Sequence, residues 1–249
     1  MDNTEKPDEG IVAQLQLVPG STYIPYHLNE GIALRLNQAA AMAREEGYSH
    51  LLTMDQDSSF DAGVFDRYVS KATKYLDEHV DNVGVFAVNF QPQFCKADEQ
   101  PQEVLSTITS GSIISLAFHK AINGYNTALF LDLVDADFCY RINLAGYKTI
   151  LFSDIILNHA IGYHVPGRSL KNFKVTPRRI HPPVRIYYLV RNSLFMLNKQ
   201  QLPDGAKKEI HKALGLLKNN LLYNKRFQVI RHIVKAYVDY RKGKMGKIQ

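Results

Sequence analysis

Residues 50–60 read His-Leu-Leu-Thr-Met-Asp-Gln-Asp-Ser-Ser-Phe, a short apolar run that ends in two carboxylates, Asp55 and Asp57. Short apolar runs are typical of buried strands in α/β sheets, whose binding sites lie at the carboxyl ends of strands. Residues two apart on an extended chain point the same way, so both carboxylates are expected to face one point. Such a pair favours a divalent cation, Mg²⁺ or Mn²⁺. The alternative is a plain turn, because Asp and Ser are favoured in turns.

The pattern around this stretch alternates between helix and strand, which predicts an α/β fold with a mainly parallel sheet flanked by helices. Helices are expected over residues 29–47, where Asn29 caps the start, and over 61–78. The expected strands cover residues 50–54, 83–88, 111–118, 147–152 and 155–157. From Val184 onward, apolar residues recur at helical spacing, which predicts a helical C-terminal region.

Charge is distributed unevenly along the 249 residues. Residues 204–249 contain 12 Lys and Arg against three Asp and Glu, whereas the rest of the chain contains 18 against 21. A basic tail with an apolar stripe fits a helix at an anionic membrane surface, and a solvated helical face is the simpler alternative. Nucleic-acid binding is not expected, because no recognised nucleic-acid-binding motif accompanies the tail.

Two cysteines make neither a disulfide framework nor a zinc cluster, and the polar N-terminus does not read as a signal peptide. No run reaches the roughly 18 apolar residues that a membrane span needs. The expected location is therefore the cytoplasm, including a membrane face that looks onto it.

A second acidic cluster contains Asp132, Asp135 and Asp137, followed by an apolar helical pattern. One aspartate is explained by capping of a helix N-terminus, but three within six residues exceed that need. An aspartate held near a metal-bound phosphate suits a general base that deprotonates a hydroxyl. Arg141 is expected to hold one of these carboxylates rather than to touch a substrate.

Residues 160–183 are rich in proline, glycine and basic side chains, which predicts a long basic loop. A basic loop near an acidic metal site suits a phosphate clamp or lid, with Arg178 and Arg179 among its cations. The alternative is a solvated connector.

Six blocks in order resemble the family 2 glycosyltransferases of the GT-A fold, specifically the bacterial rhamnosyltransferase-like branch. The resemblance runs from about Asp2 to about Arg191. The blocks are residues 29–37, the DQDS block at 54–58, the Ser-Gly strand at 109–112, residues 130–147, the histidine segment at 159–162 and the YYxxRN helix at 187–192.

The resemblance implies a nucleotide-sugar donor, dTDP-rhamnose or a UDP-sugar. Asp55 would lie near the ribose and metal, and Asp57 would coordinate the divalent cation through the diphosphate. His159 would be a third metal ligand, against the alternative of a satisfied buried histidine. The resemblance also implies that Ser110 and Gly111 contact the acceptor.

By the same resemblance Asp135 would be the catalytic base. Val134 stands where the family has Glu, so Asp132 and Asp137 remain rival bases. Asp2 would read the nucleotide base, with a disordered terminus as its alternative.

The implied reaction is inverting, metal-assisted transfer of a sugar to a saccharide or lipid-linked acceptor in cell-surface polysaccharide synthesis. Two alternatives are a phosphatase of the haloacid-dehalogenase type and a degenerate GT-A remnant that binds a partner or membrane. The family opens with a strand and helix that do not precede Met1. We therefore expect an N-terminally truncated GT-A core at residues 1–183 and a basic helical extension at 184–249.

Overall fold

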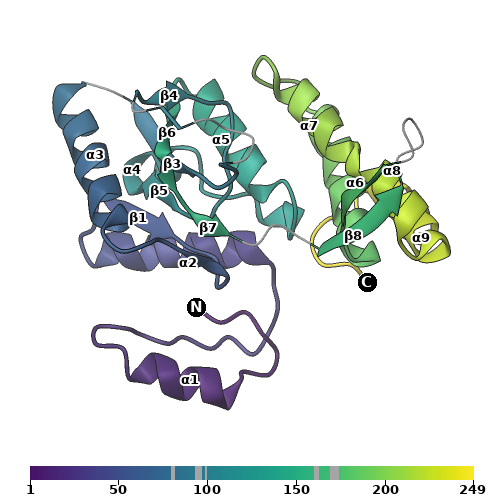
Figure 1. Ribbon diagram of the computed structural model, residues 1–249, viewed down its shortest axis with the longest axis horizontal. Helices are drawn as coiled ribbons and strands as arrows, with labels where there is room; N and C mark the ends of the chain where they lie inside the picture. Colours follow the sequence, from purple (N-terminus) through teal and green to yellow (C-terminus); the bar gives the residue numbers. More distant parts are fainter. Residues whose placement is uncertain (80–81, 93–96, 99, 160–162, 169–173) are drawn as a thin grey trace.

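The computed structural model describes the chain except residues 80–81, 93–96, 99, 160–162 and 169–173. A sheet with helices on its faces forms one lobe, and four helices with a β-hairpin form a second lobe beside it (Figure 1). The N-terminal segment contacts α2 (Ile32–Glu45) through Asn3 and Arg35, and its helix α1 (Glu9–Gln16) lies apart from the sheet lobe, below α2 in Figure 1.

The central sheet places its described strands in the order β1-β5-β3-β6-β4. Strands β1, β3 and β6 point the same way, as the predicted parallel arrangement requires, while β5 and β4 run against their neighbours. The α/β class is therefore confirmed, with a mixed sheet. The strands are β1 (His50–Thr53), β3 (Val83–Asn89), β4 (Gln102–Glu103), β5 (Ser112–Ser115) and β6 (Lys148–Ile156).

Helices cover both faces of this sheet because its central strand β3 is apolar on both sides. On one face, Phe86 stacks on Phe152 under Tyr68 of α3 (Val64–Glu78). On the other face, Val85 packs with Phe138 of α5 (Val134–Leu144) and with residues of α2. The short helix α4 (Leu116–Ala121) and the 3₁₀ turn η1 (Thr127–Leu129) connect β5 to α5.

Three expected boundaries are wrong. The first helix begins at Ile32 rather than after Asn29, because the Ile32 N–H donates to the Phe130 carbonyl and Gly31 precedes it at φ 90°. The strand expected over residues 111–118 ends at Ser115, and Leu116 already begins α4. The two short strands expected over 147–157 are one continuous strand, β6.

The helical lobe contains α6 (Pro183–Leu197), α7 (Ala206–Leu214), α8 (Leu216–Tyr223) and α9 (Arg226–Arg241). Helix α6 runs through its centre and carries the most buried side chains of the lobe, including Tyr187, Tyr188 and Arg191. The expected C-terminal helices are thus present. The division into units at residues 1–183 and 184–249 stays a prediction.

The prediction of a long basic loop over residues 160–183 is wrong for the residues in this range that the structure describes. Strands β8 (Tyr163–Arg168) and β9 (Val175–Ile180) pair antiparallel, with Pro166 opposite Pro177. Proline is tolerated here because the outer edges of a two-stranded ribbon need no ladder bonds. The hairpin packs on α8, where the Tyr223 hydroxyl donates to the Arg168 carbonyl at 2.5 Å. Among the described residues, no helix is both long and apolar enough to cross a membrane.

Candidate active site

Asp55, Asp57 and His159 come together beyond the end of β1. One ligand atom from each lies within 4.8 Å of the others. The histidine is brought there by a short ladder between β2 (Ser58–Ser59) and β7 (Asn158–His159), in which Ser58 pairs with His159. His159 Nδ1 lies 3.2 Å from an Asp57 carboxylate oxygen and 2.8 Å from the Ser58 hydroxyl oxygen. The three predicted ligands therefore converge.

The Ser-Gly block supports this strand-end group from the neighbouring strand. The Ser110 hydroxyl accepts from the Asp55 N–H at 3.0 Å and donates to the Ser58 hydroxyl at 2.8 Å. Gly111 donates its N–H to the Thr53 carbonyl at 2.8 Å with φ +76°, and a Cβ there would lie 2.6 Å from Val88. These contacts hold the turn that carries the carboxylates, and contact of Ser110 and Gly111 with an acceptor stays a prediction.

The donor set of the strand-end group fits a divalent cation. Two carboxylates and an imidazole converge, and the Asp57 side chain is 47% exposed, which leaves room for a ligand from solvent. Burial raises the pKa of the Asp55 carboxyl, and the charge of Asp57 adds to the rise while that of His159 opposes it. A cation would relieve this repulsion between the two carboxylates.

The three carboxylates of the second cluster differ in what holds them. Asp137 is fully buried between Arg141, whose Nε donates at 2.8 Å, and the Lys199 ammonium group. Asp132 accepts from Arg185 Nε at 2.8 Å. Asp135 has no ion pair with any described residue, and one of its oxygens accepts from the Ala136 N–H at 2.8 Å. Arg141 thus holds one of these carboxylates, as predicted, and the choice of Asp135 as the catalytic base stays a prediction.

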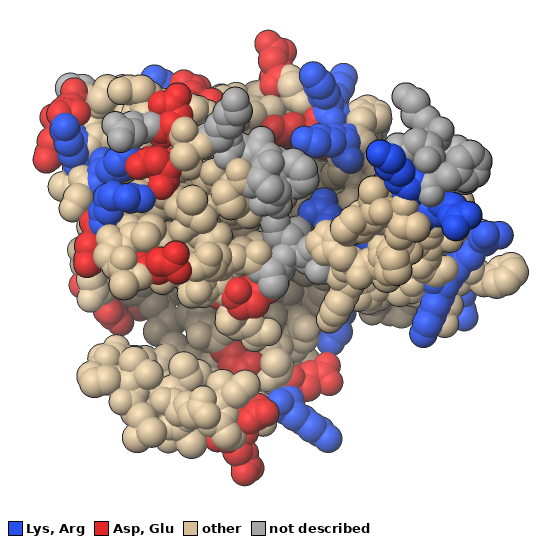
Figure 2. Space-filling view, viewed as in Figure 1, with Lys and Arg blue, Asp and Glu red and all other residues tan. Residues whose placement is uncertain are grey.

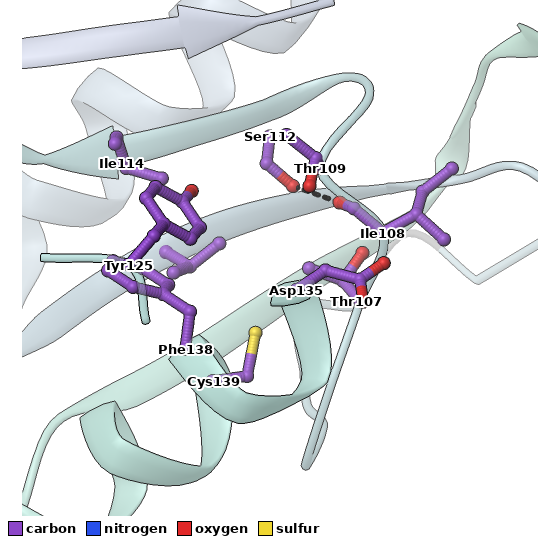
Figure 3. A pocket seen from close by; sticks show the side chains of 10 residues that line it. Thr107, Ile108, Thr109, Ser112, Ile114, Tyr125, Asp135, Phe138 and Cys139 are labelled. Carbon is purple, nitrogen blue, oxygen red and sulfur yellow. Dashed lines mark hydrogen bonds between the residues drawn. The ribbon is translucent and has the colours of Figure 1, made fainter. Parts of the chain in front are cut away.

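Asp135 occupies the first turn of α5 and lines a small cavity. Figure 3 shows its side chain next to Thr107, with Cys139 one turn further along the helix. Burial raises the pKa of the Asp135 carboxyl to about 6, and the nearby charge of Asp132 contributes in the same direction. A base whose pKa lies near neutral pH is well matched to proton abstraction from a hydroxyl.

The loop that leads into α5 has an unusual backbone. Phe130, Asp132 and Leu133 all have positive φ, between 55° and 62°, a conformation that costs energy for large side chains. The Asn192 amide holds this loop by donating to the carbonyls of Leu129, Leu131 and Asp132 at 2.6–2.9 Å.

Arg191, buried beside Asn192, also supports this loop. Its guanidinium donates to the Leu129 carbonyl at 3.3 Å and to the Gly246 carbonyl at 2.7 Å. The Arg-Asn pair of the YYxxRN block therefore fixes the backbone that carries Asp132 and Asp135.

Arg185 is a candidate site residue that sequence reasoning missed. It lies in the first turn of α6, its side chain is 45% exposed, and it pairs with Asp132. Burial raises the pKa values of Asp55 and Asp135, and the positive charge of Arg185 partly opposes both rises. The signal in the sequence was a basic side chain two residues before the YYxxRN block, at the start of a helix.

Arg178 and Arg179, the two arginines predicted to bind the donor phosphates, lie in different surroundings. Arg179 lies near Arg185, whereas Arg178 packs within the hairpin. Burial, with the nearby charge of Arg185, lowers the pKa of Arg179. The Arg178 side chain lies against Gly167 in the hairpin. A lid or phosphate clamp made of these residues stays a prediction.

Asp2 is ordered and engaged with its own segment. Its carboxylate accepts from the Tyr23 hydroxyl at 2.6 Å and from the Thr4 N–H at 2.8 Å, and these bonds hold its pKa below the usual value. Its backbone bridges to Pro25. Recognition of a nucleotide base by Asp2 stays a prediction.

Comparisons with known proteins find one likeness in sequence and one in fold. No profile of a known protein family matches the sequence. The dTDP-rhamnosyl transferase RfbF of Shigella flexneri is 28% identical over 193 residues, which is 70% of this chain and 62% of that protein. The chain thus spans less than two thirds of this curated relative. The crystal structure of S. aureus TarS residues 1–349 with UDP-GlcNAc superposes with a TM-score of 0.54 at 14% identity, covering 95% of this chain and 68% of that one.

The two likenesses are of different kinds. The TarS likeness concerns the fold, and the RfbF likeness concerns the sequence over most of this chain. The chain is therefore similar in sequence to a curated dTDP-rhamnosyl transferase and shares the fold of TarS, while membership of the family 2 glycosyltransferases stays a prediction.

Proposed function

We propose that this chain transfers a sugar from a nucleotide-sugar donor to a hydroxyl acceptor. The observation that carries the proposal is the convergence of Asp55, Asp57 and His159 at a strand end. Asp135 adds a carboxylate that forms no ion pair with any residue that the structure describes. Arg185 connects the two groups electrostatically. A divalent cation, Mg²⁺ or Mn²⁺, held by the three ligands would neutralise the diphosphate leaving group.

The proposed role of Asp135 is that of general base. It takes the proton from the acceptor hydroxyl as the hydroxyl oxygen attacks the anomeric carbon, on the face opposite the diphosphate. The bond to the diphosphate oxygen breaks as the new glycosidic bond forms, so the configuration inverts. Arg185 supports the step by holding Asp132 in place and by adding positive charge near the departing diphosphate.

The curated relative favours a dTDP-sugar as donor, since its name states dTDP-rhamnosyl transfer. The structural neighbour was solved with UDP-GlcNAc, so a UDP-sugar is the second candidate. A saccharide or lipid-linked acceptor, a place in polysaccharide synthesis and a cytoplasmic location belong to the same proposal. A haloacid-dehalogenase phosphatase is disfavoured because neither comparison points to that fold.

The test is release of nucleoside diphosphate from dTDP-rhamnose and from UDP-sugars in the presence of Mn²⁺. We expect the wild type to release dTDP or UDP slowly without an acceptor, and Asp57→Ala to lose this release. Asp66→Ala, an exposed aspartate on α3, is the matched control and should behave as the wild type. Release from no donor, together with no binding of dTDP or UDP, would support a degenerate remnant instead.

A further inference from the structure

Helix α9 lies at the outer edge of the helical lobe (Figure 1), and five of its apolar residues are exposed to solvent. The side chain of Phe227 is 87% exposed, that of Val234 56% and that of Tyr237 50%. Ile230 and Val238 complete the stripe at 43% and 39%. Their spacing of three to four residues puts all five on one side of the helix.

The opposite side of α9 is already used by the fold. Val229 and Ala236 are fully buried and pack with α6 residues, and Ile233 packs against the same cluster. Helix α9 is therefore apolar on two sides. Because core packing accounts for only one of them, the outward stripe needs another explanation.

Basic side chains flank the outward stripe. Residues 225–247 contain eight Lys and Arg and a single acidic residue, Asp239. Asp239 is buried, where it accepts from the Tyr187 hydroxyl at 2.8 Å and pairs with Lys235 at 3.1 Å. On the helical wheel Arg226 lies on one side of the stripe and Arg231 on the other. Figure 2 shows Lys and Arg gathered over this lobe, whereas Asp and Glu lie mainly over the sheet lobe.

From this arrangement we infer that the outward face of α9 docks on an anionic lipid bilayer. Exposed aromatic and aliphatic side chains enter the boundary between headgroups and acyl chains, and the flanking cations contact anionic headgroups. A second copy of the chain is a poorer occupant, because two such faces would bring their basic rims together without acidic partners. The inference concerns a surface away from the proposed active site and does not depend on the transfer reaction.

The test is co-sedimentation of the whole chain with two kinds of vesicle: phosphatidylcholine alone, and an equal mixture of phosphatidylcholine and phosphatidylglycerol. We expect binding to the mixed vesicles that weakens as salt is added. Phe227→Ser combined with Val234→Ser should weaken binding by about tenfold or more. Arg226→Gln and Arg231→Gln should each weaken it by about fivefold.

The matched control is Val69→Ser combined with Leu76→Ser on α3, which removes two apolar side chains that are 41% and 36% exposed on the other lobe. This pair should leave binding unchanged, and circular dichroism should show that all variants are folded. The inference is overturned by absence of binding to the mixed vesicles or by equal binding to both vesicle types. It is also overturned if ultracentrifugation finds a dimer that the Phe227 and Val234 changes dissociate.

Discussion

The two acidic groups of this chain are built in opposite ways. The strand-end group of Asp55, Asp57 and His159 sits on a turn and a two-residue ladder, with Asp57 half-exposed and supported mainly through hydroxyls and backbone. In the cluster at residues 132–137, the carboxylates are mostly buried, and Asp137 is held by two cations. An open group is suited to taking a cation and a phosphate from solvent, and a rigid one to orienting a proton acceptor.

The three aspartates of the second cluster also differ from one another in whether a cation is paired with them. Asp132 and Asp137 have cationic partners, which fix the positions of their carboxylates. Asp135 has burial without a paired cation, and burial alone makes a carboxylate a stronger base. The sequence left three candidate bases, and the absence of an ion pair to Asp135 among the described residues is our reason for proposing it as the base.

The largest expected effect is on the chemical step. Asp135→Asn should lower kcat for sugar transfer by about 10²- to 10⁴-fold, because the amide cannot accept the hydroxyl proton. Donor affinity should change little. Steady-state kinetics with a dTDP- or UDP-sugar and calorimetry of the free nucleotide measure the two effects. A variant that keeps its kcat would remove Asp135 from the mechanism.

The next effect is on stability rather than chemistry. Asp137→Asn should lower the free energy of unfolding by about 2–3 kcal/mol, because it leaves two largely buried cations without their carboxylate. Urea unfolding followed by circular dichroism measures this change. Asp66→Asn on the exposed side of α3 is the control and should have almost no effect. If Asp137→Asn unfolds like the wild type but loses activity, Asp137 rather than Asp135 acts on substrate.

Substitution of Arg185 tests whether its charge acts on both the strand-end group and the cluster at residues 132–137. Arg185→Gln should weaken binding of the nucleoside diphosphate and lower kcat by about tenfold, since one charge-assisted hydrogen bond is lost. Arg185→Lys should recover part of the binding. Arg178→Gln, whose side chain packs in the hairpin, is the matched comparison. Equal losses in both Gln variants would show that positive charge anywhere on the lobe is enough.

The smallest expected effect is a pH dependence with opposite signs for activity and stability. The pKa of Asp135 is raised from 3.8 to about 6, so the folded chain holds this proton more tightly than the unfolded chain does. Stability from this group is present at low pH and is lost as pH rises through about 6, whereas activity rises over that range.

Asp135→Asn checks this sign. The variant should unfold at a higher temperature than the wild type at alkaline pH, and the gap should shrink as the pH falls through about 6. A difference in unfolding temperature that does not depend on pH would show that the pKa of the Asp135 carboxyl is not raised.

Much of this fold could be predicted from local pattern, because its central strands are short, apolar and bounded by turns. Val83–Asn89 is buried along its whole length, and the helix after Asp61 is found nearly where expected. The β8–β9 hairpin could not be predicted, because its prolines argue for a loop and its support comes from α8, far along the chain.

In the candidate site, too, features that depend on neighbouring residues could be predicted, and those that depend on contacts between distant residues could not. The pair of Asp55 and Asp57 is visible in the sequence because their spacing is local. The roles of Asp135, Arg185 and Asn192 depend on contacts that join residues 50 or more positions apart. Spacing indicates which residue types are present, but only the folded chain shows which carboxylates already have a partner.

The central claim is that the strand-end group binds the donor and Asp135 moves the proton. Calorimetric titration of dTDP and UDP, with and without Mn²⁺, into the wild type, Asp57→Ala and Asp135→Asn tests it most directly. We predict Mn²⁺-dependent binding of the nucleotide in the wild type and in Asp135→Asn, and loss of that binding in Asp57→Ala. Binding that survives Asp57→Ala, or that is lost in a folded Asp135→Asn, would contradict it.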